Sequence, residues 1–106
     1  MIEQQKLQID PKHWQLVDSI LAEYLSDCDI YAFGSRARLD AKTYSDLDLG
    51  LKGPGPISHQ KLAVASLAFE ESDLPWTVDL VDLNAISPAF NAAIANDLTL
   101  LRSASS

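Results

Sequence analysis

Apolar side chains recur at helical spacing in the first quarter of the chain. They are Trp14, Leu16, Val17, Ile20, Leu21 and Tyr24. Asp10 followed by Pro11 is typical of a helix N-cap and first helical position. The pattern therefore predicts a helix from residue 11 to about residue 25, which the polar run 26–29 ends.

Short apolar runs between turn residues predict three strands, at residues 30–33, 46–51 and 76–83. A short helix is expected at 36–39, a polar loop at 40–45, and a longer helix from Ser58 to about residue 71. Ser87 and Pro88 repeat the cap-and-proline start, and the apolar spacing after them predicts a final helix that reaches Leu101. The tail 103–106 is expected to be frayed.

This order of helices and strands predicts an α/β (α+β) fold, with a small mixed sheet of about three to four strands flanked by helices. The 106 residues are enough for one domain and too few for two, so we expect a single domain over 1–106. The Gly53-Pro54-Gly55-Pro56 segment is interpreted as an exposed loop between two halves of that domain.

Composition and charge narrow the class of protein. The hydrophobic fraction of 47% and the charged fraction of 22% are ordinary for a globular protein, and no apolar run approaches a membrane span. The first residues carry no signal-peptide pattern, and the single Cys28 excludes an internal disulfide, so a cytoplasmic location is expected. The net charge of −7, with scattered basic residues, argues against extended DNA or RNA as a partner.

Two aspartates alternate with leucines in the second predicted strand. Side chains alternate between the faces of a strand, so Asp46 and Asp48 share one face while Leu47, Leu49 and Leu51 share the other. Neighbouring carboxylates repel each other unless a cation lies between them, and Mg²⁺ prefers such oxygen ligands. A solvated strand face is the alternative.

The third predicted strand carries two further aspartates, at opposite strand parity. Asp79 lies inside the apolar run and Asp82 lies near its end. If this strand pairs with the second one, Asp79 completes a three-carboxylate cluster, whereas Asp82 is interpreted as a surface or turn residue.

Gly34 and Ser35 follow the first predicted strand. A glycine there allows a sharp turn and the close approach of a ligand, and free N–H groups at a helix start favour a phosphate. A plain strand-to-helix turn is the alternative. Arg36 and Arg38 are candidate phosphate ligands, with a surface ion pair between Arg38 and Asp40 as the competing interpretation.

These residues together resemble a known signature. Gly34-Ser35, ten residues, and then Asp46-Leu47-Asp48 are similar to the motif of the DNA-polymerase-β-like nucleotidyltransferase superfamily. The fuller string from Phe33 to Leu49 resembles its minimal nucleotidyltransferase branch, which includes MntA-type antitoxins encoded beside HEPN-domain proteins. Val78-Asp79-Leu80-Val81 is similar to the strand that carries the family's third aspartate.

The resemblance implies a nucleotidyltransferase fold and an enzyme that transfers a nucleoside monophosphate from an NTP to a hydroxyl group. Asp46, Asp48 and Asp79 would be catalytic and would hold two Mg²⁺ ions, and Gly34, Ser35 and Arg36 would bind the nucleotide. In the antitoxin branch the implied donor is ATP, and the implied acceptor is a tyrosine of a HEPN-type toxin partner.

Two other functions remain open from the sequence. In the first, the chain is a non-catalytic subunit that masks a HEPN partner. In the second, it transfers nucleotides to a small molecule or an RNA end. The intact Gly-Ser pair and the three aspartates favour catalysis. The small size and the acidic charge favour an acceptor that a partner protein supplies.

Overall fold

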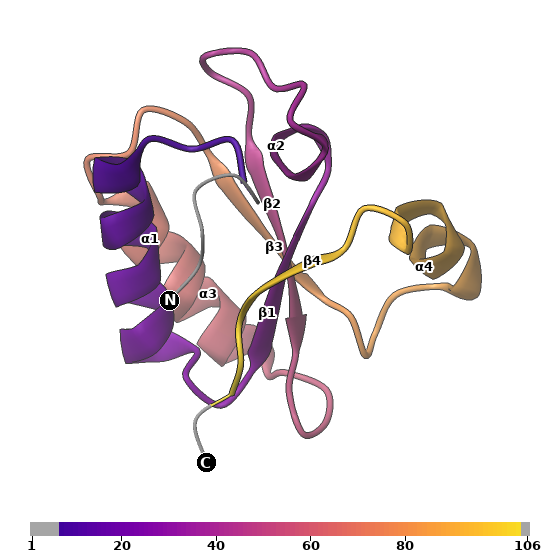
Figure 1. The fold of residues 1–106 in the computed structure, drawn as a ribbon. Helices are drawn as coiled ribbons and strands as arrows, with labels where there is room; N and C mark the ends of the chain where they lie inside the picture. Colours follow the sequence, from indigo (N-terminus) through magenta and orange to yellow (C-terminus); the bar gives the residue numbers. More distant parts are fainter. Residues whose placement is uncertain (1–6, 105–106) are drawn as a thin grey trace.

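The computed structural model describes residues 7–104, which form a four-stranded sheet flanked by helices (Figure 1). The strands are β1 (Asp29–Phe33), β2 (Leu47–Lys52), β3 (Val78–Asp82) and β4 (Thr99–Arg102). The helices are α1 (Pro11–Tyr24), α2 (Ser35–Arg38), α3 (His59–Glu70) and α4 (Pro88–Ile94). The predicted mixed α/β fold is confirmed. The start of the chain, where no signal peptide was expected, and the last two residues of the predicted frayed tail lie outside the described range.

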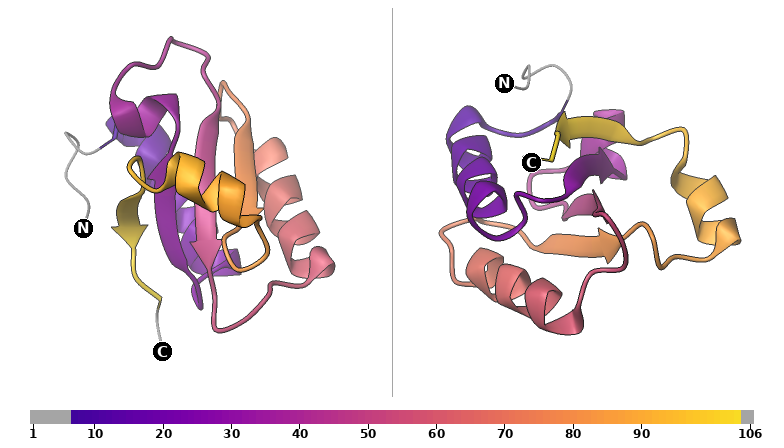
Figure 2. Two further views of the ribbon diagram at one scale, coloured as in Figure 1. Left: turned by 90° about the vertical axis from the view of Figure 1, so that its right-hand side faces the viewer. Right: turned by 90° about the horizontal axis from the view of Figure 1, so that it is seen from below.

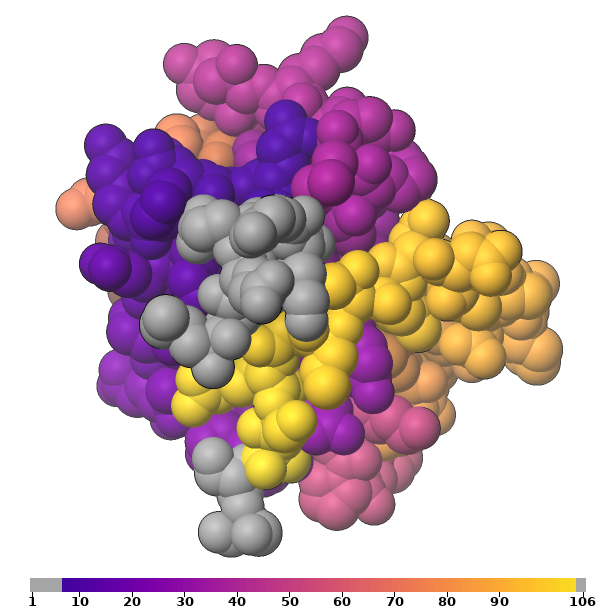
Figure 3. All heavy atoms as spheres, viewed as in Figure 1, coloured from indigo at the N-terminus to yellow at the C-terminus, as the bar shows by residue number. Residues whose placement is uncertain are grey.

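The sheet has the order β3-β2-β1-β4. β1 pairs antiparallel with both β2 and β4, whereas β2 and β3 run parallel, because α3 forms the crossover between them. α1 and α3 cover one face of the sheet, and α4 lies on the opposite side (Figures 1 and 2). Figure 3 shows the α4 segment projecting from the body of the molecule.

The core lies between the sheet and the two long helices. Leu47, Leu49 and Leu51 of β2 are fully buried, as the predicted alternation requires. Val17 and Leu21 of α1 meet them from the helix side within one apolar cluster. No helix within residues 7–104 combines the length and apolar character needed to cross a membrane.

Local capping explains where the helices begin. The side chains of Asp10, Ser58 and Ser87 each accept a hydrogen bond from a backbone N–H two or three residues later. These are the three starts that the sequence pattern predicts.

The predicted final helix is wrong beyond Ile94. The helix α4 ends there, and the chain turns back into the sheet as β4, with Tyr31 opposite Leu100. Without β4, β1 would be an edge strand with unpaired backbone groups, and the pairing satisfies them. Leu101 is 8% exposed and packs in the core, while Leu100 is 45% exposed, so the alternation is that of a strand.

Candidate active site

Two of the predicted carboxylates are neighbours across the sheet. Asp48 of β2 is directly opposite Asp79 of β3 in the parallel register. On its other side Asp48 is opposite Phe33 of β1, and the Phe33 ring meets that of Phe90 in α4 edge-to-face at 6.1 Å between centroids. Residues opposite each other share a face of the sheet, so the carboxylate pair lies on the α4 side, away from the core.

The environment of Asp48 disfavours its charged form. Partial burial raises the pKa of Asp48 to about 6, and the charge of Asp79, a hydrogen bond between the two carboxyl groups and the charge of Asp46 add to the rise. Arg38 acts in the opposite direction and lowers the pKa of Asp48. A carboxyl group held near other carboxylates in this way is typical of a site that binds a cation.

Gly34 lies against this pair. Its φ of 78° is in the region that favours glycine, and an added Cβ would overlap Oδ2 of Asp48. The missing side chain therefore leaves room directly beside the carboxylate. Ser35, the first residue of α2, follows Gly34 in the chain.

Asp46 lies just before β2 and is exposed. It is near enough to Asp48 to raise the pKa of that carboxyl group. Within residues 7–104, however, no three His, Cys, Asp or Glu side chains are grouped closely enough to hold a metal ion by themselves. The directly adjacent carboxylates of the site are therefore those of Asp48 and Asp79, and the exposed Asp46 lies at the edge of the site.

Asp82 makes backbone contacts and does not lie opposite Asp48 as Asp79 does. Its carboxylate accepts hydrogen bonds from the backbone N–H groups of Ile57 and Asn84, at 2.8 and 2.9 Å. These contacts hold the loops that enter α3 and leave β3. The structure thus separates the two aspartates as their opposite strand parity predicts.

Arg36 does not lie where a phosphate ligand is expected. The side chain is buried, 5% exposed, and its guanidinium donates to the backbone carbonyls of Gln8, Thr43 and Ser45. It also stacks on Trp76, with Cζ 4.4 Å from the ring centroid. The predicted contact of Arg36 with nucleotide phosphates is therefore wrong, because Nε, Nη1 and Nη2 all donate to backbone carbonyls of the protein itself.

Arg38 is exposed and forms ion pairs with Asp40 at 3.4 Å and with Asp97 at 3.0 Å. The pair with Asp40 is the surface contact that the sequence offered as the alternative. Asp97, which follows α4, had been predicted within a helix, so its position beside Arg38 could not be expected from the sequence.

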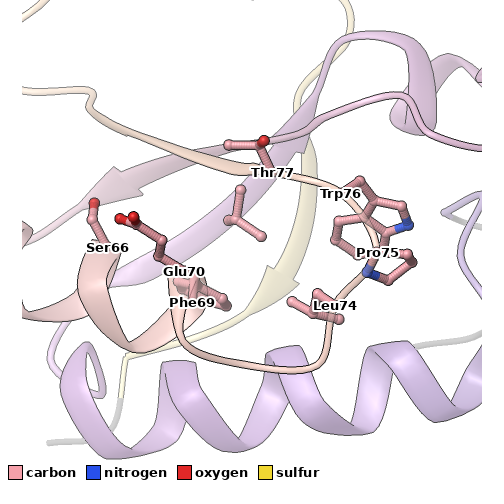
Figure 4. Close-up of a pocket in the computed structure, with 8 residues that line it drawn as sticks. Ser66, Phe69, Glu70, Leu74, Pro75, Trp76 and Thr77 are labelled. Atoms are coloured by element: carbon pink, nitrogen blue, oxygen red, sulfur yellow. The ribbon is translucent and has the colours of Figure 1, made fainter.

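A cavity of about 570 Å³ opens elsewhere, between the end of α3 and the start of β3 (Figure 4). Phe69, Leu74 and Trp76 line it together with Glu70. None of the candidate carboxylates Asp46, Asp48 and Asp79 contributes to its wall.

Comparison with known proteins identifies the family of the chain. The family model described as polymerase beta, nucleotidyltransferase, matches residues 17–106. The chain belongs to this nucleotidyltransferase family. The matched range contains every candidate site residue of this nucleotidyltransferase, from Gly34 to Asp79.

Similar proteins agree with this membership. The nucleotidyltransferase is 39% identical over 89 residues to "Probable protein adenylyltransferase MntA" of Haemophilus influenzae (strain ATCC 51907 / DSM 11121 / KW20 / Rd), a match that covers 84% of this chain and 78% of that protein. A crystal structure of a toxin–antitoxin with AMP-PNP superposes with a TM-score of 0.70 at 21% identity, over 84% of this chain and 72% of the other. A mutant MntA–HpeT toxin–antitoxin structure gives 0.68 at 21% identity, over 91% and 74%. At this identity the two structures show that the nucleotidyltransferase fold is shared.

Proposed function

We propose that this nucleotidyltransferase transfers AMP from ATP to a hydroxyl group of a HEPN-type toxin partner and acts as the antitoxin of that pair. The observation that carries the proposal is the Asp48–Asp79 carboxylate pair, placed against the side-chain-free Gly34. The similarity to a protein adenylyltransferase supports AMP as the transferred group, and the toxin–antitoxin neighbours support a toxin as the partner.

The donor groups of the site fit Mg²⁺. This ion is usually bound by one or two carboxylates together with substrate phosphates, so the Asp48–Asp79 pair is a sufficient protein contribution. We propose that Asp46 and Asp48 hold two such ions and that Asp79 joins one of them. When bound, Mg²⁺ neutralises charge on the triphosphate and on the transferring phosphoryl group.

The residues of the chain itself have separate roles in this proposal. Gly34 leaves space for the triphosphate to approach Asp48, and Ser35 offers its hydroxyl and the start of α2 to the phosphates. The acceptor oxygen forms a bond to the α-phosphorus, the bond from that phosphorus to the β-phosphate oxygen breaks, and pyrophosphate leaves. Asp79 accepts the proton of the acceptor hydroxyl.

The acceptor is supplied by the partner in this proposal. The net charge of −7 disfavours an RNA end and suits a partner with a basic surface. We propose that the chain acts as a single domain in a hetero-oligomer with the toxin, in the cytoplasm. The lone Cys28, which is buried, is consistent with a reducing compartment.

Incubation of the chain with α-labelled ATP, Mg²⁺ and the toxin encoded beside it tests the proposal. We expect label on the toxin with the wild-type chain and none with Asp46→Asn or Asp48→Asn. Asp73→Asn, an exposed position between α3 and β3, is the matched control and should label normally. If all variants protect against the toxin equally without labelling it, the chain is a non-catalytic binding subunit. Label on a small molecule or RNA end alone would contradict a protein acceptor.

A further inference from the structure

We propose that Arg36 is the positioning residue of this site, and that it sets the carboxylates of Asp46 and Asp79 on either side of Asp48. The inference rests on the proposed function, because it assigns a role toward the same carboxylates. It also replaces the corrected role of Arg36 as a phosphate ligand.

The guanidinium of Arg36 joins segments that are distant in the sequence. Its Nε and Nη2 both donate to the carbonyl of Ser45, at 3.0 and 2.8 Å, and Nη2 also donates to Thr43 at 3.2 Å. Ser45 is the residue immediately before Asp46. Two converging hydrogen bonds on one carbonyl restrict the backbone from which the Asp46 side chain departs.

A second contact leads to Asp79. The Arg36 guanidinium lies over the Trp76 ring at 4.4 Å, and Trp76 is buried just before β3. The next residue, Thr77, accepts a hydrogen bond from the N–H of Leu47 at 2.9 Å, which begins the pairing of β3 with β2. The position of the guanidinium is therefore coupled to the register that places Asp79 opposite Asp48.

Gln8 completes the connection. Nη1 of Arg36 donates to the Gln8 carbonyl at 2.8 Å, and the Gln8 N–H donates to the Arg36 carbonyl at 3.0 Å. The Gln8 side-chain amide then bonds both the carbonyl and the N–H of Ala41, at 2.8 and 2.9 Å. The loop before Asp46 is thus held at Ala41 by Gln8 and at Thr43 and Ser45 by Arg36.

The charge of Arg36 is not neutralised by a direct ion pair. Across residues 7–104, no carboxylate lies in ion-pair contact with its guanidinium, and backbone carbonyls take its hydrogen bonds instead. Burial lowers the pKa of Arg36, and the charge of Asp46 acts against that lowering. The buried cation therefore attracts Asp46 toward the side of the loop that it holds.

Lysine cannot replace this geometry, because an ammonium group is a point charge without the planar fork of donors. We expect Arg36→Lys to weaken binding of Mn²⁺, used as the probe for Mg²⁺, by roughly 10–100-fold, the range for residues that orient metal ligands. Paramagnetic resonance measures Mn²⁺ binding to the chain alone, and AMP transfer to the toxin gives kcat and KM. The kcat should fall while the KM for ATP changes little. Gln8→Ala should shift Mn²⁺ affinity and kcat in the same direction, without removing a buried charge.

Arg102→Lys is the matched control. Arg102 pairs with Asp18 of α1 at 2.7 Å, so the variant loses a partly buried arginine contact away from the carboxylates. We expect it to lower the melting temperature while Mn²⁺ affinity and kcat stay within about twofold of wild type. All binding is measured well below the lowest melting temperature of the set.

The outcomes separate the two proposals. If Arg36→Lys and Gln8→Ala lower only the melting temperature, as Arg102→Lys does, the positioning role is wrong. A wild-type chain that binds Mn²⁺ but transfers no AMP would contradict the proposed function, and the Mn²⁺ comparison would still decide the role of Arg36. A wild-type chain that binds no Mn²⁺ would overturn the positioning role.

Discussion

Asp48 and Asp79 lie directly opposite each other on the parallel strands β2 and β3, although α3 separates them in the chain. In the strand order β3-β2-β1-β4, Gly34, which follows β1, lies against the same Asp48 carboxylate from the β1 side. Three separate segments therefore contribute to one point on the α4 side of the sheet.

The pairing of Asp48 with Asp79 makes stability depend on pH. The pKa of Asp48 rises from 3.8 to about 6 on folding, so between these values the folded chain binds the proton more tightly than the unfolded chain does. The free energy of unfolding should therefore fall as the pH rises through this window. After allowance for solvent screening, we expect a fall of about 1–2 kcal/mol from this group. Denaturant unfolding at several pH values without Mg²⁺ measures it, and Asp48→Asn should remove this part of the dependence. An unchanged pH profile in Asp48→Asn would contradict the raised pKa.

Gly34→Ala should damage both the fold and the activity. The new Cβ would overlap Asp48, and the alanine backbone would have to adopt a positive φ, so we expect a loss of at least about 1 kcal/mol in unfolding free energy. AMP transfer should be lost because the space beside Asp48 is filled. Gly55→Ala is the matched control, since an added Cβ there meets nothing within 4 Å. Equal behaviour of the two variants would show that Gly34 needs no such space.

Asp79→Asn and Asp82→Asn should separate catalysis from loop stability. Asp79→Asn removes a carboxylate from beside Asp48 and should lower AMP transfer by about a hundredfold or more, while stability at neutral pH is kept because repulsion is relieved. Asp82→Asn weakens the hydrogen bonds to Ile57 and Asn84 and should cost about 1 kcal/mol, with transfer nearly unchanged. Transfer assays and chemical denaturation on both variants make the comparison. The reverse pattern would assign the third carboxylate to Asp82.

Leu101→Ala and Leu100→Ala test whether the end of the chain is a strand. Leu101 is buried in the core, so its truncation should cost about 2–4 kcal/mol in unfolding free energy, whereas the more exposed Leu100 should cost less than about 1 kcal/mol. Denaturant unfolding measures both. Equal losses would contradict the alternation that β4 imposes on these neighbours.

The local pattern of the chain was enough to predict most elements. Capping residues and apolar spacing predicted where α1, α3 and α4 begin, and the alternation around Asp48 predicted which β2 side chains enter the core. These features depend on residues close together in the sequence, so local physics decides them. The Gly-Ser pair and the spaced aspartates likewise predicted the nucleotidyltransferase family.

Three features depended on contacts between distant segments. Leu98 and Leu101 fit a helical spacing, but the segment 99–102 instead forms β4, because it pairs with the otherwise open edge of β1. The sequence predicted Arg36 as a phosphate ligand. An arginine after a Gly-Ser turn carries no sign that three backbone carbonyls and Trp76 will surround it. Gln8 carried no signal at all, because its partner Ala41 is distant in the chain.

The sequence by itself thus determined most of the elements, the face of β2 on which Asp48 lies, and the family, since periodicity and motif spacing are local properties. Only the tertiary structure decided that β3 pairs with β2 so that Asp79, rather than Asp82, lies next to Asp48. It also decided that the Arg36 side chain is buried. Strand order and register arise from the packing of α1 and α3 on one face of the sheet, and from backbone pairing that no single segment specifies.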